Sequence, residues 1–166
     1  MESTKTLSAK STTDLLESAR RERGILGPFV QLTKPRLSMM SVASAIFGYF
    51  SAAPQERDTA LFLSLLAGTA LAAAGAAALN QWLEIKEDSL MRRTSDRPLP
   101  AGALRPIQAL IVGLLTSMAG LAILAIGTNI FAMLLTLGVL FFYLALYTPM
   151  KKSTPLATEA GAISGA

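Results

Sequence analysis

The 166-residue chain contains no cysteine and no histidine. These absences exclude disulfide bonds, thiolate nucleophiles, imidazole general bases and zinc sites built from the usual ligands. Charged residues make up only 16% of the chain, whereas 52% of it is hydrophobic. This composition is typical of an integral membrane protein. Catalysis, if present, must therefore depend on carboxylates, cations, hydroxyls and a bound metal.

Four uncharged apolar runs are each close to the roughly 20 residues that span a bilayer as a helix. They are Leu37 to Ala53, Ala60 to Leu83, Ile107 to Ile126 and Ile130 to Tyr147. Pro106 suits the first turn of the third helix, and Gly127 to Asn129 predicts a tight turn before the fourth. The sequence thus predicts an all-α transmembrane bundle, with a helix for each run.

The first 27 residues differ from the rest because they are polar and rich in Ser, Thr and charge. Leu15, Leu16 and Ala19 share one side of a possible short amphipathic helix between Thr13 and Arg23. No short apolar core with a small-residue cleavage site follows, so a cleaved signal peptide is not indicated. We expect residues 1–27 to form a polar tail on the cytoplasmic face and residues 28–166 to form the membrane domain.

The basic residues divide unequally between the two sides of this predicted bundle. Fourteen of the 15 Lys and Arg residues fall before the first run, between the second and third, or after the fourth, and Arg57 alone falls on the other side. The positive-inside rule places the N-terminus and the segment after the second run in the cytoplasm. The net charge of +4 comes without aromatic platforms or groove-reading motifs, so nucleic acid is not an expected partner.

Asn80, Glu84 and Asp88 lie at the end of the second run with a spacing of four residues. This spacing turns by only about 80° over the three positions of a helix, so all three side chains share one face. Magnesium commonly joins one or two carboxylates to substrate phosphates. The pattern therefore favours a site for a metal and a diphosphate.

Three arginines follow this acidic face at once, at positions 92, 93 and 97. Their planar guanidinium groups match the oxygens of a phosphate. The alternative is a helix that ends in an ordinary charged loop. Carboxylates at a helix C-terminus are destabilised by roughly 0.3–1 kcal/mol, and a bound cation would reverse that sign, which favours the metal site.

The second run also carries a series of small residues from Gly68 to Ala78. Such residues let helices approach closely in a membrane. We therefore expect the second helix to lie at the centre of the bundle, with its acidic face directed away from lipid. Ionisable groups at that depth are candidates for function.

Several motifs of the chain together resemble those of the UbiA-type intramembrane prenyltransferases. The likeness covers about residues 28–166 and is closest to the branch that farnesylates protohaem IX. It rests on Asn80-x3-Glu84-x3-Asp88, Leu90-Met-Arg-Arg-Thr94, Arg97-Pro-Leu-Pro100-x-Gly102, Leu32-Thr-Lys-Pro-Arg-Leu37 and Tyr147-Thr-Pro-Met-Lys151-Lys152-Ser-Thr154. The first three of these pieces form one continuous stretch and count as one motif. Three ordered motifs at suitable topological positions are more specific than the acidic repeat alone.

The resemblance implies a function and a set of roles. Asn80, Glu84 and Asp88 would be the catalytic residues, with Glu84 and Asp88 binding Mg²⁺ partly through water. The diphosphate of farnesyl diphosphate would be bound by Arg92, Arg93, Arg97, Lys151 and Lys152. The farnesyl group would be transferred to a vinyl group of protohaem IX to give haem O, within the bilayer of a bacterial inner membrane. Lys34 and Arg36 would more simply anchor the membrane edge.

The chain also departs from the family pattern. Glu84 stands where the family often has Asp, and Ala157 stands where it commonly has Asn. The family has about nine helices and a second acidic motif, so we expect these 166 residues to be a truncated N-terminal portion without turnover on its own. A quinone precursor or another aromatic acceptor, and a non-catalytic four-helix membrane module, are the alternatives.

Overall fold

The computed structural model describes residues 26–52 and 58–148. Regular structure in these two ranges is entirely helical, which confirms the predicted all-α class. The helices in chain order are α2 (Leu26–Thr33), α3 (Pro35–Ser51), α4 (Thr59–Leu83), α5 (Ile85–Leu90), α6 (Pro106–Gly127), α7 (Ile130–Phe141) and the π-helix η1 (Phe142–Tyr147). The helix expected between Thr13 and Arg23 lies outside these ranges.

Three helical segments are long and apolar enough to cross a membrane, namely α4, α6 and the continuous segment Ile130–Tyr147. The first predicted run corresponds to α3, which has the same length of 17 residues but begins and ends two residues earlier. Its apolar part is limited to Ser38–Ser51, which is shorter than the other three segments. At 1.5 Å per residue α3 rises about 26 Å, somewhat less than the roughly 30 Å of a hydrocarbon core. A short helix, α2, precedes it and was not predicted.

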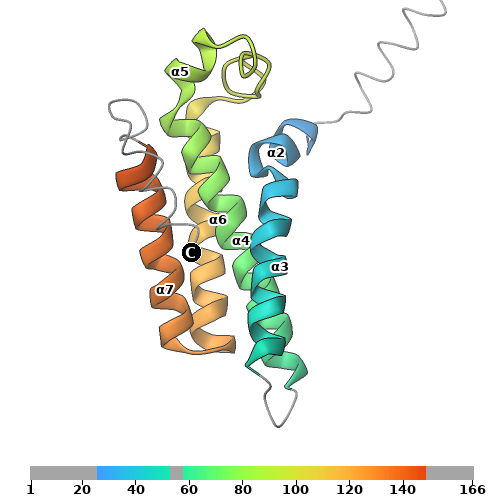
Figure 1. The fold of residues 1–166 in the computed structure, drawn as a ribbon. Helices are drawn as coiled ribbons and strands as arrows, with labels where there is room; N and C mark the ends of the chain where they lie inside the picture. The colour runs from blue at the N-terminus through green and yellow to red at the C-terminus, as the bar shows by residue number, and fades with distance from the viewer. Residues whose placement is uncertain (1–25, 53–57, 149–166) are drawn as a thin grey trace, which may run out of the picture.

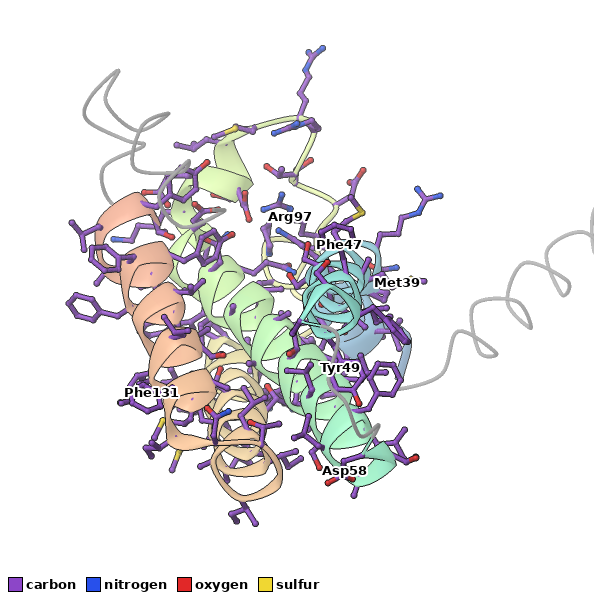
Figure 2. All side chains as sticks on the ribbon, turned by 60° about the horizontal axis from the view of Figure 1, so that its bottom comes forward. Met39, Phe47, Tyr49, Asp58, Arg97 and Phe131 are labelled. Atoms are coloured by element: carbon purple, nitrogen blue, oxygen red, sulfur yellow. The ribbon has the colours of Figure 1, made fainter. Side chains whose placement is uncertain are left out.

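Large apolar side chains are exposed on the outer helices, as a bilayer allows. Met39 and Phe47 of α3 and Phe131 of α7 are each more than two-thirds exposed and are labelled in Figure 2. In water such a surface would be unfavourable, but lipid tails solvate it. The exposed surface therefore agrees with a membrane protein.

Helix α4 is central, as predicted, because it contacts α2, α3, α6, α7 and η1 (Figure 1). It packs most closely on α6, where small residues of the two helices face each other. A Cβ atom added at Gly120 would lie 2.6 Å from the backbone nitrogen of Ala72, and one added at Gly75 would lie 2.7 Å from the carbonyl oxygen of Gly113. The small residues thus allow the two backbones to approach.

The turns at the far end of the bundle follow the predicted chemistry. Gly127 ends α6, and Asn129 caps α7 by accepting a hydrogen bond from the Ala132 N–H at 2.8 Å. The carboxylate of Asp58 likewise accepts hydrogen bonds from the N–H groups of Ala60 at 2.8 Å and Leu61 at 3.2 Å. The hairpin expected at Gly127 to Asn129 is therefore confirmed.

Replacing Asp58 by Ala is expected to lower the free energy of unfolding by about 1 kcal/mol, because two N–H groups at the start of α4 lose their acceptor. Asp58→Asn keeps an acceptor oxygen and is the matched control, with an expected loss near zero. Reversible unfolding in mixed micelles measures both variants. Equal losses in the two variants would show that the carboxylate does not act as a cap.

At the opposite end of the bundle, the chain breaks between α2 and α3. Lys34 has a φ of 45°, and Pro35 disfavours the right-handed helical conformation in the residue before it. The chain therefore turns at Lys34, and α2 packs on α4. Gln81 of α4 donates a hydrogen bond from Nε2 to the carbonyl oxygen of Leu32 at 2.8 Å. This buried amide fixes α2 beside the C-terminal part of α4.

Candidate functional site

The acidic face is not carried by one unbroken helix, contrary to the prediction. Helix α4 ends at Leu83, Glu84 has φ −106° and ψ 10°, and α5 begins at Ile85. The spacing of four residues nevertheless survives, because the N–H of Glu84 donates to the carbonyl oxygen of Asn80 at 3.1 Å and that of Asp88 donates to Glu84 at 2.8 Å. Asn80, Glu84 and Asp88 are 4%, 3% and 3% exposed.

This break also corrects the electrostatic argument from the sequence. Glu87 and Asp88 lie in the first turn of α5, where a carboxylate is favoured by the helix dipole. The unfavourable C-terminal position expected for these carboxylates therefore holds only for Glu84, which is the C-cap residue of α4. For Asp88 the case for a metal must rest on the donor groups and their burial.

The side chains of Asn80 and Glu84 belong to a buried hydrogen-bonded chain. Asn80 donates from Nδ2 to Glu84 Oε2 at 3.0 Å. Thr148, which directly follows η1, donates from its hydroxyl to Asn80 Oδ1 at 2.9 Å. The end of the last described span is thereby joined to the acidic face.

Asp88 is held from the loop that follows α5. Nη1 of Arg97 forms a salt bridge with Oδ2 of Asp88, and the hydroxyl of Thr94 donates to the carbonyl oxygen of Asp88 at 2.9 Å. Figure 2 shows Arg97 at the end of the bundle opposite Asp58. Because the side chain of Arg97 is 26% exposed, its guanidinium can reach both the carboxylate and an incoming anion.

The structure does not gather every predicted cation around the acidic face. Arg92 and Arg93 are exposed in the turns that follow α5, whereas Arg97 makes direct contact with Asp88. Lys151 and Lys152 lie outside the described residues. The roles proposed for these cations stay predictions, and Arg97 is the one that the geometry places at the acidic face.

A cavity of about 480 Å³ lies between α3, α4 and α7. Its wall on α4 includes Thr69, Ala73 and Ala76. Asn80 continues this stripe, because successive steps of four, three and four residues stay on one face of a helix. Tyr143 of η1 also lines the cavity, close in sequence to Thr148. The cavity therefore lies along the side of α4 that carries Asn80, and its lining on α4 ends at Ala77, before the acidic face begins.

The donor groups of the acidic face suit magnesium. Within residues 26–52 and 58–148, no group of three or more His, Cys, Asp and Glu side chains could hold a metal. The acidic face instead offers two buried carboxylates and one amide oxygen. Magnesium often binds through one or two carboxylates and completes its shell with water and substrate phosphate. Asn80, Glu84 and Asp88 fit the protein side of such a site.

Three residues of this region were missed as site residues in the sequence. Gln81 is next to Asn80 but turns toward α2, and Thr148 and Tyr143 come from the last span. A polar amide near the end of an apolar run was the available signal for Gln81. Thr148 lies 68 positions from Asn80, so local spacing could not connect them.

Comparison with known proteins adds to this geometry. The UbiA prenyltransferase family matches residues 41–166. The chain belongs to this family. The match covers α4, α5 and the loop that carries Arg97, so the acidic face lies within the family domain. No solved structure matches the chain significantly.

Curated relatives agree with this assignment. The "Protoheme IX farnesyltransferase" of Opitutus terrae is 46% identical over 83% of this chain and 46% of its own length. Those of Solibacter usitatus and Aquifex aeolicus are 41% and 36% identical, over 83% and 90% of this chain and 50% and 52% of their own lengths. The chain spans about half the length of the curated relatives it matches.

Proposed function

We propose that the protein transfers a farnesyl group from farnesyl diphosphate to protohaem IX and makes haem O. The observation that carries this proposal is the buried face of Asn80, Glu84 and Asp88, with Arg97 beside it and an apolar cavity along the same side of α4. An isoprenoid diphosphate has the same division into a highly charged head and an apolar chain. The acidic face would bind the head, and the cavity would bind the chain.

The predicted magnesium ligands suit the diphosphate head of farnesyl diphosphate. Magnesium bound to Glu84 and Asp88, partly through water, would neutralise charge on the diphosphate and make it a better leaving group. Arg97 would turn from Asp88 toward the phosphate oxygens, and Arg92, Arg93, Lys151 and Lys152 would add positive charge around them. Such preorganised charges stabilise the departing diphosphate anion most strongly where water is scarce.

The reaction then needs no histidine or cysteine. The C1–O bond of farnesyl diphosphate breaks, and the electron pair leaves with the diphosphate. The terminal carbon of a haem vinyl group bonds to C1 of the allylic cation. Water adds to the resulting benzylic-type cation and loses a proton, which leaves a hydroxyethylfarnesyl side chain. The acidic face acts on the leaving group, so its role in this scheme is electrostatic.

The choice of protohaem as acceptor is supported by the relatives rather than by the acidic face. The three relatives described above share one name, protoheme IX farnesyltransferase. We further propose that the acidic face opens to the cytoplasm of a bacterial inner membrane, as the distribution of Lys and Arg predicts. Figure 1 shows α2 and α5 at the same end of the bundle, as this topology requires.

The acceptor can be tested with the full-length protein in nanodiscs. Farnesyl diphosphate and Mg²⁺ would be supplied with either protohaem IX or an aromatic quinone precursor, and products would be identified by mass. The proposal predicts farnesylated haem with one added water and release of one diphosphate. Prenylation of the quinone precursor alone would reassign the acceptor, and the absence of any transfer would favour a non-catalytic module.

The location of the farnesyl chain leads to a separate prediction. Ala76→Phe fills the cavity beside Asn80, so the KM for farnesyl diphosphate is expected to rise about 10-fold or more, as lost apolar burial of about 1.4 kcal/mol implies. Competition assays would compare farnesyl diphosphate with a five-carbon allylic diphosphate, whose affinity should change little. Ala119→Phe, on an exposed position of α6, is the control. Equal effects on both diphosphates would indicate that the farnesyl chain binds outside this cavity.

A further inference from the structure

Thr148 is nearly inaccessible, with 1% of its surface exposed, and its hydroxyl reaches the acidic face from another helix. Oγ1 lies 2.9 Å from Asn80 Oδ1 and 2.8 Å from the carbonyl oxygen of Tyr143. A hydroxyl has one hydrogen to donate. Its single hydrogen is therefore within donating distance of two acceptors, the Asn80 amide oxygen and the Tyr143 carbonyl oxygen.

The Glu84 carboxylate decides which way the Asn80 amide points, because an ionised carboxylate can only accept hydrogen bonds. Nδ2 of Asn80 donates to Glu84 Oε2 at 3.0 Å, while Oδ1 accepts from Thr148. If the amide were rotated by half a turn, Oδ1 would face the Glu84 carboxylate and two acceptors would be opposed. The carboxylate therefore favours a single orientation of the amide. In that orientation Oδ1 of Asn80 and Oγ1 of Thr148 are two oxygens 2.9 Å apart, so the hydroxyl hydrogen lies between them.

The π-helix explains how Thr148 comes to this place. In η1 the N–H of Thr148 bonds to Tyr143, five residues earlier, whereas an α-helix would use the carbonyl four residues earlier. The widened turn holds one additional residue and so changes the face on which the following residue lies. Single π-turns inside longer helices are frequent at functional sites.

We propose that Thr148 is a positioning residue for the metal and diphosphate site. Its hydroxyl fixes the Asn80 amide, which in turn orients the carboxylate of Glu84, so that the acidic face is preorganised for the cation. The inference rests on the proposed function, because it assigns Thr148 to the same site. Partners that orient metal ligands in this way are worth 10–100-fold in metal affinity or activity.

The test compares Thr148→Val with Thr148→Ser in the full-length protein. Valine keeps the shape of threonine without the hydroxyl, and serine keeps the hydroxyl. Mn²⁺ would serve as the probe, and its Kd would be measured by electron paramagnetic resonance in the presence of a non-hydrolysable farnesyl diphosphate analogue. Thr148→Val is expected to weaken Mn²⁺ binding about 10–100-fold, whereas Thr148→Ser is expected to stay within about 3-fold of the natural protein.

Two further variants keep the outcomes distinct. Asp88→Asn in the same assay tests the site itself, so unchanged Mn²⁺ binding in that variant would overturn the proposed function. Loss of binding in Asp88→Asn with unchanged binding in Thr148→Val would overturn only the role of Thr148. In an Asn80→Ala background, Thr148→Val is expected to have no further effect, because the amide that it orients is absent.

The melting temperature of each variant serves as the control for folding. If Thr148→Val does not assemble, Thr148→Ala asks the same question without a bulky side chain. Failure of both variants to fold, with Thr148→Ser intact, would contradict a positioning role and make the hydroxyl a structural requirement. Equal weakening of Mn²⁺ binding by serine and valine would contradict it as well.

Discussion

Asp88→Asn is expected to reduce kcat/KM for magnesium-dependent farnesyl transfer by at least about 100-fold. The substitution keeps the size of the side chain and removes one of the two buried carboxylates of the acidic face. The Asn side chain can still accept a hydrogen bond from Arg97, whose side chain is 26% exposed and can also reach water. We therefore expect the variant to fold, so that the lower kcat/KM reflects the missing carboxylate rather than misfolding.

Asp96→Asn is the matched control for this change. Asp96 lies in the same loop region but is exposed, and it does not belong to the repeat of four residues. Its activity is expected to remain within about 2-fold of the natural protein, since surface charges contribute little. Initial rates across a range of Mg²⁺ concentrations would measure both variants. Similar losses in the two would indicate that the loop needs general negative charge rather than a carboxylate at position 88.

Gly120→Ala is expected to destabilise the bundle by about 1–3 kcal/mol. A Cβ atom at this position would lie 2.6 Å from the backbone nitrogen of Ala72 and 2.7 Å from the carbonyl oxygen of Gly68. Backbone atoms cannot rotate away as a side chain can, so α4 and α6 must separate. The gain of up to about 1 kcal/mol from replacing a helical glycine offsets only part of this cost.

Gly138→Ala is the control for the same chemical change. Nothing lies within 4 Å of a Cβ atom added there, so only the helix propensity of alanine should act, and stability should rise slightly. Unfolding in mixed micelles, followed by circular dichroism, would give the free energy of unfolding for both variants. A stabilising effect of Gly120→Ala would contradict the close packing of α4 on α6.

Features with a local chemical signal could be predicted from the sequence. The helical class follows from the apolar runs, the first turn of α6 from Pro106, and the turn after α6 from Gly127 and Asn129. The central place of α4 follows from its small residues. That Asn80, Glu84 and Asp88 lie on one side also follows, because their spacing of four residues is kept across the break at Glu84.

Features that depend on tertiary contacts could not be predicted in this way. No glycine or proline marks the break at Glu84, and the break changes the electrostatic setting of Asp88. Helix α2 is held by the amide of Gln81, and the hydroxyl of Thr148, the residue directly after the π-helix η1, reaches Asn80. Both hydrogen bonds join residues that are distant in sequence, so local spacing could not predict them.

The most direct test of the proposed site is a diffraction structure of the full-length protein with Mn²⁺ and a non-hydrolysable farnesyl diphosphate analogue. We expect an anomalous peak next to Glu84 and Asp88, at direct or water-bridged coordination distance. We also expect a diphosphate in contact with Arg97 and the isoprenoid chain against Ala73 and Ala76. A metal bound away from both carboxylates, or an isoprenoid chain that leaves this cavity empty, would contradict the proposed site.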